Sequence, residues 1–166
     1  MKATLIIEGK EIEIEISEEE YKKLHLSETG YERVLPDNGF YYATSRGHIE
    51  SGIDAYDYID NEYYESANYY SSETVAENNI RADNLMRQLR RFAVEHREYE
   101  VDFNSTNTKK YYIYYDCNND GLGVSSVFCS KGFGVIYFNS EETALAAIEE
   151  FHDELIWYFT EYKDSL

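Results

Sequence analysis

The sequence predicts an α+β fold, with two small antiparallel β-meanders, a long central helix and a long C-terminal helix. Runs of alternating apolar and polar residues, bounded by turn residues, occur in two groups along the chain. Each group is followed by a segment whose apolar residues recur every three or four positions, as on one face of a helix. The chain has 166 residues, 43% of them hydrophobic, which is enough to build a core around these elements.

Residues 3–16 predict a β-hairpin that turns at 8–10. Isoleucines alternate with glutamates in its second strand, so one face is apolar and the other carries Glu11, Glu13 and Glu15. Neighbouring glutamates lie about 6.8 Å apart, twice the rise per residue of a strand, and phosphates along one nucleic-acid strand have a similar spacing. The hairpin therefore predicts a DNA-like row of negative charge.

Ser17 and Glu20 fit a capping box at the start of a short helix over 18–24. Three strand-like runs, separated by turn residues at 36–39 and 45–48, then predict the first meander. These runs are residues 31–35, 40–44 and 49–53.

Between residues 54 and 70, tyrosines and acidic residues interleave without a clean period, which predicts a short helix and a loop. From 72 to 97, an apolar stripe over more than six turns predicts the central helix. The strands of the second meander are predicted at 110–115, 121–129 and 135–138. A stripe that begins after a cap at Asn139 or Ser140 and reaches Tyr162 predicts the last helix.

We expect one compact body with two parts. Residues 1–70 form an acidic β-rich lobe, and residues 71–166 hold the central helix, the second meander and the last helix. Acidic residues outnumber basic ones 16 to 6 in residues 1–70 and 10 to 2 in 111–166, whereas 71–110 has 7 of each. Arginines of this balanced stretch are expected to pair with acids of the flanking regions.

The formal net charge of −18 repels nucleic acid and anionic lipid, so neither is expected as a direct ligand. No apolar run reaches the roughly 18 residues of a membrane span, and no signal peptide opens the chain, so a cytoplasmic location is expected. The two cysteines, Cys117 and Cys129, are too few for a disulfide framework in a chain of this length.

One turn matches the first half of a calcium-binding loop, with Asp116, Asn118, Asp120 and Gly121. The bidentate glutamate of such a loop is replaced by Val127, and strands rather than helices flank the segment. A hairpin turn rich in Asn, Asp and Gly explains the same residues, so we expect no metal ion here.

Catalytic residues are not expected. The four histidines lie in different predicted elements and lack metal-ligand spacing: His25, His48, His96 and His152. Neither cysteine has a nearby histidine, and no phosphate-binding loop is present. The sequence therefore predicts no cofactor and a protein that is not an enzyme, since an enzyme would need a histidine and a carboxylate to meet in a cleft.

On the last helix, Glu149 with Asp153 and Glu150 with Glu154 form like-charge pairs four residues apart, which cost stability. A face selected only for solubility usually mixes charges of both signs. For any single acidic residue, a solvated position on an acidic protein is the simpler interpretation. Together, however, the acidic stretches favour a surface that occupies a basic groove.

Two segments, 110–116 (Lys-Tyr-Tyr-Ile-Tyr-Tyr-Asp) and 135–142 (Val-Ile-Tyr-Phe-Asn-Ser-Glu-Glu), with the helix at 144–155 that follows, resemble a recurring C-terminal unit. It occurs in small proteins of phages and mobile elements of Gram-positive bacteria. The preceding helix, 81–97, is similar to the segment that often comes before this unit. The resemblance covers residues 72–163, and because its motifs are structural it transfers no catalytic residue.

Some small acidic phage proteins of this kind are anti-CRISPR inhibitors. The resemblance therefore implies a type II effector such as Cas9 as the target, because its heteroduplex channel and PAM reader are lined with Lys and Arg. It also implies that the protein acts in the bacterial host cell.

We therefore predict an anti-CRISPR-type inhibitor that binds Cas9 or its guide RNA complex and blocks target DNA by acidic mimicry. Tyr63 and Tyr64 are expected to stack on arginines of this partner. The predicted partner-binding residues are Glu11, Glu13, Glu15, Asp54, Asp57, Asp60, Glu62, Glu65, Tyr63 and Tyr64. The alternative is a non-enzymatic phage accessory or structural protein whose tyrosines form a homodimer or larger homo-oligomer.

Overall fold

The computed structural model describes the chain except for residues 1, 8–9, 16, 18–28 and 165–166. Its strands are β1 (Lys2–Ile7), β2 (Lys10–Glu15), β3 (Gly39–Ala43), β4 (Ile49–Ile53), β5 (Lys110–Asp116) and β6 (Gly121–Val127). Its helices are α2 (Tyr58–Glu65), α3 (Glu73–Glu95), α4 (Glu141–Glu150) and α5 (His152–Thr160). The predicted α+β class and the long central helix are confirmed.

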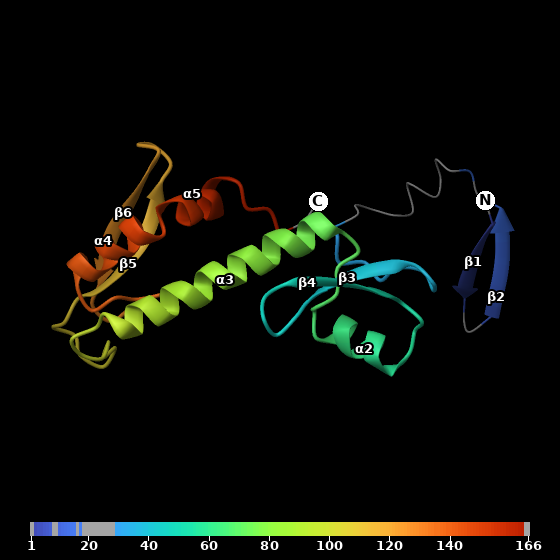
Figure 1. Ribbon diagram of the computed structural model, residues 1–166, viewed down its shortest axis with the longest axis horizontal. Helices are drawn as coiled ribbons and strands as arrows, with labels where there is room; N and C mark the ends of the chain where they lie inside the picture. The colour runs from blue at the N-terminus through green and yellow to red at the C-terminus, as the bar shows by residue number, and fades with distance from the viewer. Residues whose placement is uncertain (1, 8–9, 16, 18–28, 165–166) are drawn as a thin grey trace.

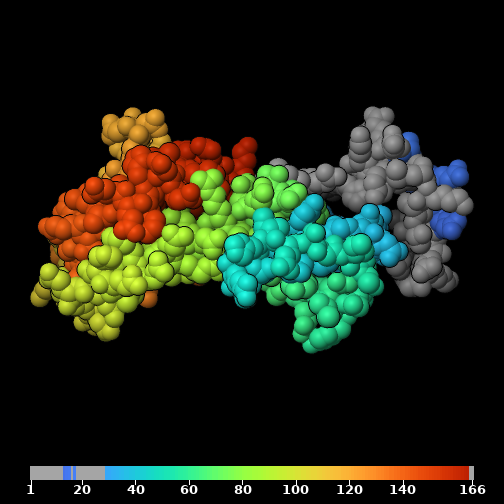
Figure 2. Space-filling view, viewed as in Figure 1, coloured from blue at the N-terminus to red at the C-terminus, as the bar shows by residue number. Residues whose placement is uncertain are grey.

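Helix α3 is the axis of the molecule (Figure 1). The β3–β4 hairpin and α2 lie beside its N-terminal half, and β5, β6, α4 and α5 gather around its C-terminal half. The hairpin of β1 and β2 lies beyond β3 and β4. The molecule is therefore elongated, and α2 and the tip of the β5–β6 hairpin project from its opposite long sides (Figure 2).

The hairpins β3–β4 and β5–β6 belong to the same kind of unit. In each, one residue two positions before a helix cap exchanges both backbone hydrogen bonds with the first strand of the hairpin. Tyr70 pairs in this way with Tyr41, at 2.8 and 2.9 Å, and Phe138 pairs with Tyr111, at 2.8 and 3.0 Å. A short aromatic anchor thus joins each hairpin to the helix that follows it.

The two helices after these anchors begin in the same way. Ser72 caps α3 by accepting a hydrogen bond from the third backbone N–H of the helix, and Ser140 does the same for α4. Four residues after each cap, an alanine is fully buried, Ala76 in one unit and Ala144 in the other. A small side chain at this position lets the helix lie close to its hairpin.

The two units have separate apolar cores. The larger core combines α3, α4, α5 and the second anchor through Leu85, Leu89, Phe92, Phe138, Ala144, Ala147 and Leu155. The smaller core contains Tyr70, Val75 and Ala76. Next to it, the rings of Phe40 and Tyr69 stack in parallel with centroids 4.3 Å apart. The first unit therefore relies on aromatic stacking more than the second.

Two predicted strands are absent, and each meander reduces to a two-stranded hairpin with one bridging residue. Residues 31–35 do not pair as a strand, because the N–H of Val34 donates to the hydroxyl of Tyr69 instead of to a sheet. In the second unit, only Phe138 of the predicted strand 135–138 pairs with β5.

The predicted last helix is two helices, with a break at Phe151. The backbone of Phe151 leaves the helical region at φ −110° and ψ 22°, and its ring packs edge-on against Phe92 with centroids 5.7 Å apart. Each like-charge pair predicted on one continuous helix therefore spans this break, with Glu149 and Glu150 on α4 and Asp153 and Glu154 on α5. Glu154 lies on α5 and pairs with Arg81 at 2.8 Å.

The remaining predicted elements agree with the structure. The N-terminal hairpin is β1–β2, the short helix between 54 and 70 is α2, and the central helix begins after its serine cap. The predicted helix at 18–24 lies outside the described residues.

Candidate partner-binding surface around helix α2

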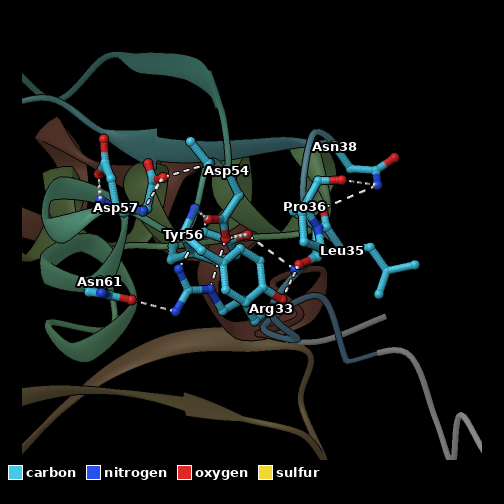
Figure 3. A network of polar contacts seen from close by, with 12 residues as sticks. Arg33, Leu35, Pro36, Asn38, Asp54, Tyr56, Asp57 and Asn61 are labelled. Carbon is cyan, nitrogen blue, oxygen red and sulfur yellow. Dashed lines mark hydrogen bonds and ion pairs between the residues drawn. The ribbon is translucent and has the colours of Figure 1, made fainter. Parts of the chain in front are cut away.

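An ion pair between Arg33 and the buried Asp54 lies next to the loop that leads into α2 (Figure 3). Nε and Nη2 of Arg33 donate to the two carboxylate oxygens of Asp54 at 2.8 and 3.0 Å. The hydroxyl of Tyr69 donates to the same carboxylate at 2.9 Å, and the backbone N–H of Tyr56 does so at 2.8 Å. Asp54 is fully buried, so its carboxylate is satisfied entirely from within the chain.

These bonds stabilise the charged form of Asp54. The hydrogen bond from the Arg33 guanidinium is the main cause that lowers the pKa of Asp54 to about 2, against the raising effect of burial. The prediction that Asp54 faces a partner is wrong, because no part of this carboxylate reaches the surface. Its role is to fix the loop that leads into α2.

Asp57 and Asp60 form the capping box of α2. The Asp57 carboxylate accepts from the backbone N–H of Ile59 at 2.8 Å and of Asp60 at 3.0 Å. The Asp60 carboxylate accepts from the N–H of Ala55 at 2.7 Å and of Asp57 at 3.3 Å. Asp60 is buried, so its predicted place in a partner interface is also wrong, whereas Asp57 is exposed. Both residues set where α2 begins.

The guanidinium of Arg33 lies 4.0 Å from the ring centroid of Tyr56 and 5.5 Å from that of Tyr64. Its Nη1 donates to the side-chain oxygen of Asn61 at 2.6 Å. Tyr64 therefore makes the type of contact predicted for it, but with an arginine of its own chain. Tyr63 is half-buried against Tyr42, with ring centroids 4.4 Å apart. Tyr63 therefore packs inward against β3, whereas Tyr56 and Tyr64 remain partly exposed.

Exposed acidic and apolar side chains of residues 35–65 surround this network, and we call them the α2 surface. Its acidic members are exposed carboxylates, Asp37, Asp57, Glu62 and Glu65. Its apolar members are exposed large side chains, Leu35, Ile53, Tyr56, Tyr58, Ile59 and Tyr64. Within the described part of the chain, no lysine or arginine forms an ion pair with any of these four acids. The surface thus offers negative charge next to unburied apolar area.

The sequence analysis missed the apolar half of this surface. Tyr58 is 73% exposed, Ile53 67%, Leu35 64% and Ile59 58%. Ile59 joins Glu62, Tyr63 and Glu65 in the walls of a shallow groove along α2. The available signal was that α2 carries apolar residues at adjacent positions, which cannot all point to one core.

The three glutamates of the N-terminal hairpin occupy alternate positions of β2, opposite Ile6, Thr4 and Lys2 of β1. Alternate positions of a strand share one face, so Glu11, Glu13 and Glu15 form the predicted row. Glu13 and Glu15 are exposed, and the side chain of Glu11 lies outside the described side chains. This row lies on the β1–β2 hairpin, apart from helix α2.

The turn that resembles a calcium loop is held by its own hydrogen bonds. The Asp116 carboxylate accepts from the backbone N–H of Asn118 at 2.9 Å and from the side-chain amide of Asn119 at 2.5 Å. Across the described residues, no group of three or more His, Cys, Asp or Glu side chains is placed to hold a metal ion. This turn is a hairpin connection between β5 and β6.

The three described histidines are exposed, and His25 lies outside the described residues. The ring of His96 stacks on Phe92 with centroids 3.9 Å apart. The Nδ1 of His152 lies 3.0 Å from the Asp153 carboxylate. His48 lines a polar groove beside α3 together with Glu154, but Arg81 holds that carboxylate in a two-point pair at 2.8 and 3.0 Å.

The arginines of the centre bind mostly within their own segment. Arg91 pairs with Glu95, and Arg97 with Glu100. Arg81 alone among the described central arginines pairs with an acid of a flanking region, and it also lies 3.9 Å from the ring centroid of Trp157. The predicted pairing between the centre and its flanks is therefore right for this one residue.

Comparison with family models, with curated protein sequences and with solved structures gave no match. Within the described residues, no helix has both the length and the apolar character needed to cross a membrane.

Proposed function

We propose that this protein is a non-enzymatic inhibitor that binds a basic, nucleic-acid-binding defence protein of a bacterial host and excludes the nucleic acid. The α2 surface is the principal contact, and the glutamate row of β2 extends the negative charge. Cas9, alone or with its guide RNA, is the first partner to test, because the resemblance in the C-terminal half implies anti-CRISPR relatives. The protein would then act in the host cytoplasm.

One observation carries this proposal. Asp57, Glu62 and Glu65 stand exposed on a helix whose start is fixed by a capping box, and no basic side chain of the described chain neutralises them. Glu62 accepts a hydrogen bond from the Tyr58 hydroxyl and Asp57 caps the helix, but neither contact neutralises the charge. Exposed acids without basic partners repel one another and cost stability, so a partner that supplies arginines or lysines relieves this cost on binding.

The apolar members of the α2 surface add what charge alone does not supply. Tyr58 and Ile59 are large and exposed beside the acids, and tyrosine is enriched among residues that dominate binding energy. A basic groove built for nucleic acid often contains apolar and aromatic walls for bases and sugars. The combination favours a surface that substitutes for nucleic acid over one that is only well solvated.

The support beneath the surface makes it rigid before binding. Arg33 is fixed by a buried carboxylate, two aromatic rings and an amide, so the loop that presents Tyr56 and the start of α2 has little freedom. A preorganised surface loses less conformational entropy when it binds.

The decisive experiment uses a charge-reversed variant, Glu62→Lys with Glu65→Lys. Neither carboxylate takes part in the buried network, so this variant is expected to fold normally, unlike changes at Asp54 or Asp60. A gel shift and a cleavage assay with Cas9 ribonucleoprotein and target DNA would be run at about 0.05 M and about 0.5 M salt. We expect the wild type to block DNA binding, less strongly at high salt, and the variant to lose inhibition.

A matched control carries the same charge change at the other end of the molecule. Glu149→Lys with Glu150→Lys alters two exposed acids of α4 and is expected to inhibit normally apart from a small uniform weakening. Equal loss of inhibition in both variants would show that net charge, rather than the α2 surface, governs binding. Full DNA cleavage with the wild type across a panel of type II effectors would contradict Cas9 as the partner.

A further inference from the structure

The C-terminal unit contains an apolar groove that the proposed function does not use. Its volume is about 530 Å³, and its walls come from α3, β5, the loop 133–136 and α5. None of the residues that line it is charged. In a chain with a net charge of −18, an uncharged groove of this size is a distinct surface.

The apolar side chains at the rim of the groove are unusually exposed. Phe133 is 107% exposed, so its ring packs against nothing else in the chain. It lies between Gly132 and Gly134, and Gly134 adopts a φ of 75° that a residue with a side chain would resist. Tyr114 and Phe159 are also exposed by 39% and 40%. The chain therefore presents a projecting aromatic side chain, Phe133, next to an apolar groove.

We propose that this face is a homodimer interface, in which Phe133 of each copy inserts into the groove of the other. A projecting side chain beside a groove that can receive it is complementary to itself across a twofold axis, which is the requirement of an isologous contact. Burial of a Phe side chain removes about 150–250 Å² from water, and the dimer buries two.

The distribution of charge indicates that a second copy of this chain, rather than a basic partner, fills the groove. Two copies that each carry −18 can come together only where carboxylates do not meet, and the groove and its walls meet this condition. A basic partner gains nothing from a surface without acids, and the α2 surface already offers it charge. The nearest base on this loop, Lys131, lies 5.3 Å from the ring centroid of Phe103 in its own chain.

The placement of the groove leaves the α2 surface free. The groove is lined by Leu85, Met86 and Leu89 from the C-terminal half of α3, whereas α2 lies beside the N-terminal half (Figure 1). A dimer formed through the groove therefore exposes two α2 surfaces. This proposal does not depend on the proposed function. It also predicts the opposite response to salt, because salt screens the repulsion between two acidic copies and strengthens apolar contacts.

The test measures the dimer dissociation constant by sedimentation equilibrium at about 0.05 M and about 0.5 M salt. The wild type is expected to dimerise more tightly at high salt. Phe133→Ser is expected to weaken the dimer at least about tenfold, as the loss of a central aromatic contact does. Because the Phe133 side chain is fully exposed in the monomer, the thermal unfolding of the Phe133→Ser variant should match that of the wild type after correction for dimerisation.

The matched control is Phe128→Ser. Phe128 is 46% exposed directly after β6, in the segment that leads to Phe133, but does not line the groove, so this variant should dimerise like the wild type. Three results would overturn the proposal: a monomeric wild type at both salt concentrations, an unchanged dimer in Phe133→Ser, or equal weakening in both variants. Failure here leaves inhibition through the α2 surface untouched, and failure of inhibition leaves the dimer untouched.

Discussion

Asp54 shows how a single buried charge determines the local structure around it. Removal of one partner from a buried ion pair leaves the other charge without compensation, which is much more costly than the loss of an exposed pair. Arg33 is 21 positions away in the sequence, so its contact with Asp54 closes the whole β3–β4 hairpin. The pair, its tyrosine and the α2 capping box therefore form one cooperative unit.

The substitution Asp54→Asn tests this unit. The pKa of Asp54 is lowered from 3.8 to about 2, and about 1.4 kcal/mol corresponds to each pKa unit, so its ionisation stabilises the fold by roughly 2 kcal/mol. This contribution is fully present above pH 4 and is lost as the pH falls through the folded-state pKa of about 2. We expect Asp54→Asn to lower the free energy of unfolding at pH 7 by about 2–4 kcal/mol.

Urea unfolding at pH 7 and at about pH 2.5 would measure the difference between wild type and variant. The difference should shrink at the lower pH, where much of the stabilising ionisation is lost. The control Glu65→Gln removes an exposed carboxylate and should change stability by less than about 0.5 kcal/mol at either pH. A pH-independent difference would show that Asp54 acts through packing rather than through its charge.

The sequence could predict the composition of the α2 region but not the position of each carboxylate. Asp54, Asp57, Asp60 and Glu62 look alike in a segment without a clean period. Asp54 is held in the interior by Arg33, 21 positions earlier, whereas the Asp60 carboxylate turns back to the backbone N–H groups of Ala55 and Asp57. The capping box was readable in principle, since Asp57 and Asp60 have the three-residue spacing of that motif.

At the scale of elements, the two hairpin–anchor–helix units share a pattern that is easy to overlook. In both, an aromatic residue, a polar residue, Ser and Glu are followed after two positions by Ala, over 70–76 and 138–144. The sequence predicted the helices and hairpins well because their periods of 3.6 and 2 are local. It predicted a strand at 31–35, which does not pair, and one at 135–138, where only Phe138 pairs, because pairing also depends on which backbone groups side chains have already satisfied.

The buried alanines of this pattern yield a prediction about packing. Ala144 has no exposed area where α4 meets the β5–β6 hairpin, so Ala144→Leu should force the helix away and lower the free energy of unfolding by about 1–3 kcal/mol. Ala146→Leu is the matched control, because Ala146 is exposed on the same helix and leucine has a similar helix propensity. Urea unfolding compares the two variants. Equal stability in both would contradict the close approach of helix and hairpin.

At the scale of the whole molecule, the acidic residues lie in two regions joined by the balanced helix α3. Within the described part, no exposed acid on α2 or α4 forms an ion pair, so repulsion within the chain works against the folded state. Salt screens this repulsion with a Debye length of about 10 Å at 0.1 M. The melting temperature of the wild type should therefore rise between about 0.02 M and about 0.3 M salt.

A variant shows which acids cause this response. Glu149 and Glu150 occupy the last turn of α4, where the helix dipole disfavours negative charge and where no basic residue is present. The double change to glutamine should raise the melting temperature at low salt by about 2–4 °C and flatten its rise with salt. Glu154→Gln should instead lower it, because this carboxylate pairs with Arg81 across α3 and α5. Differential scanning calorimetry of the three proteins at both salt concentrations provides the comparison. A wild-type melting temperature that falls with added salt would mean that attractive pairs outweigh repulsion, and the acidic surfaces would then be part of what holds the fold together.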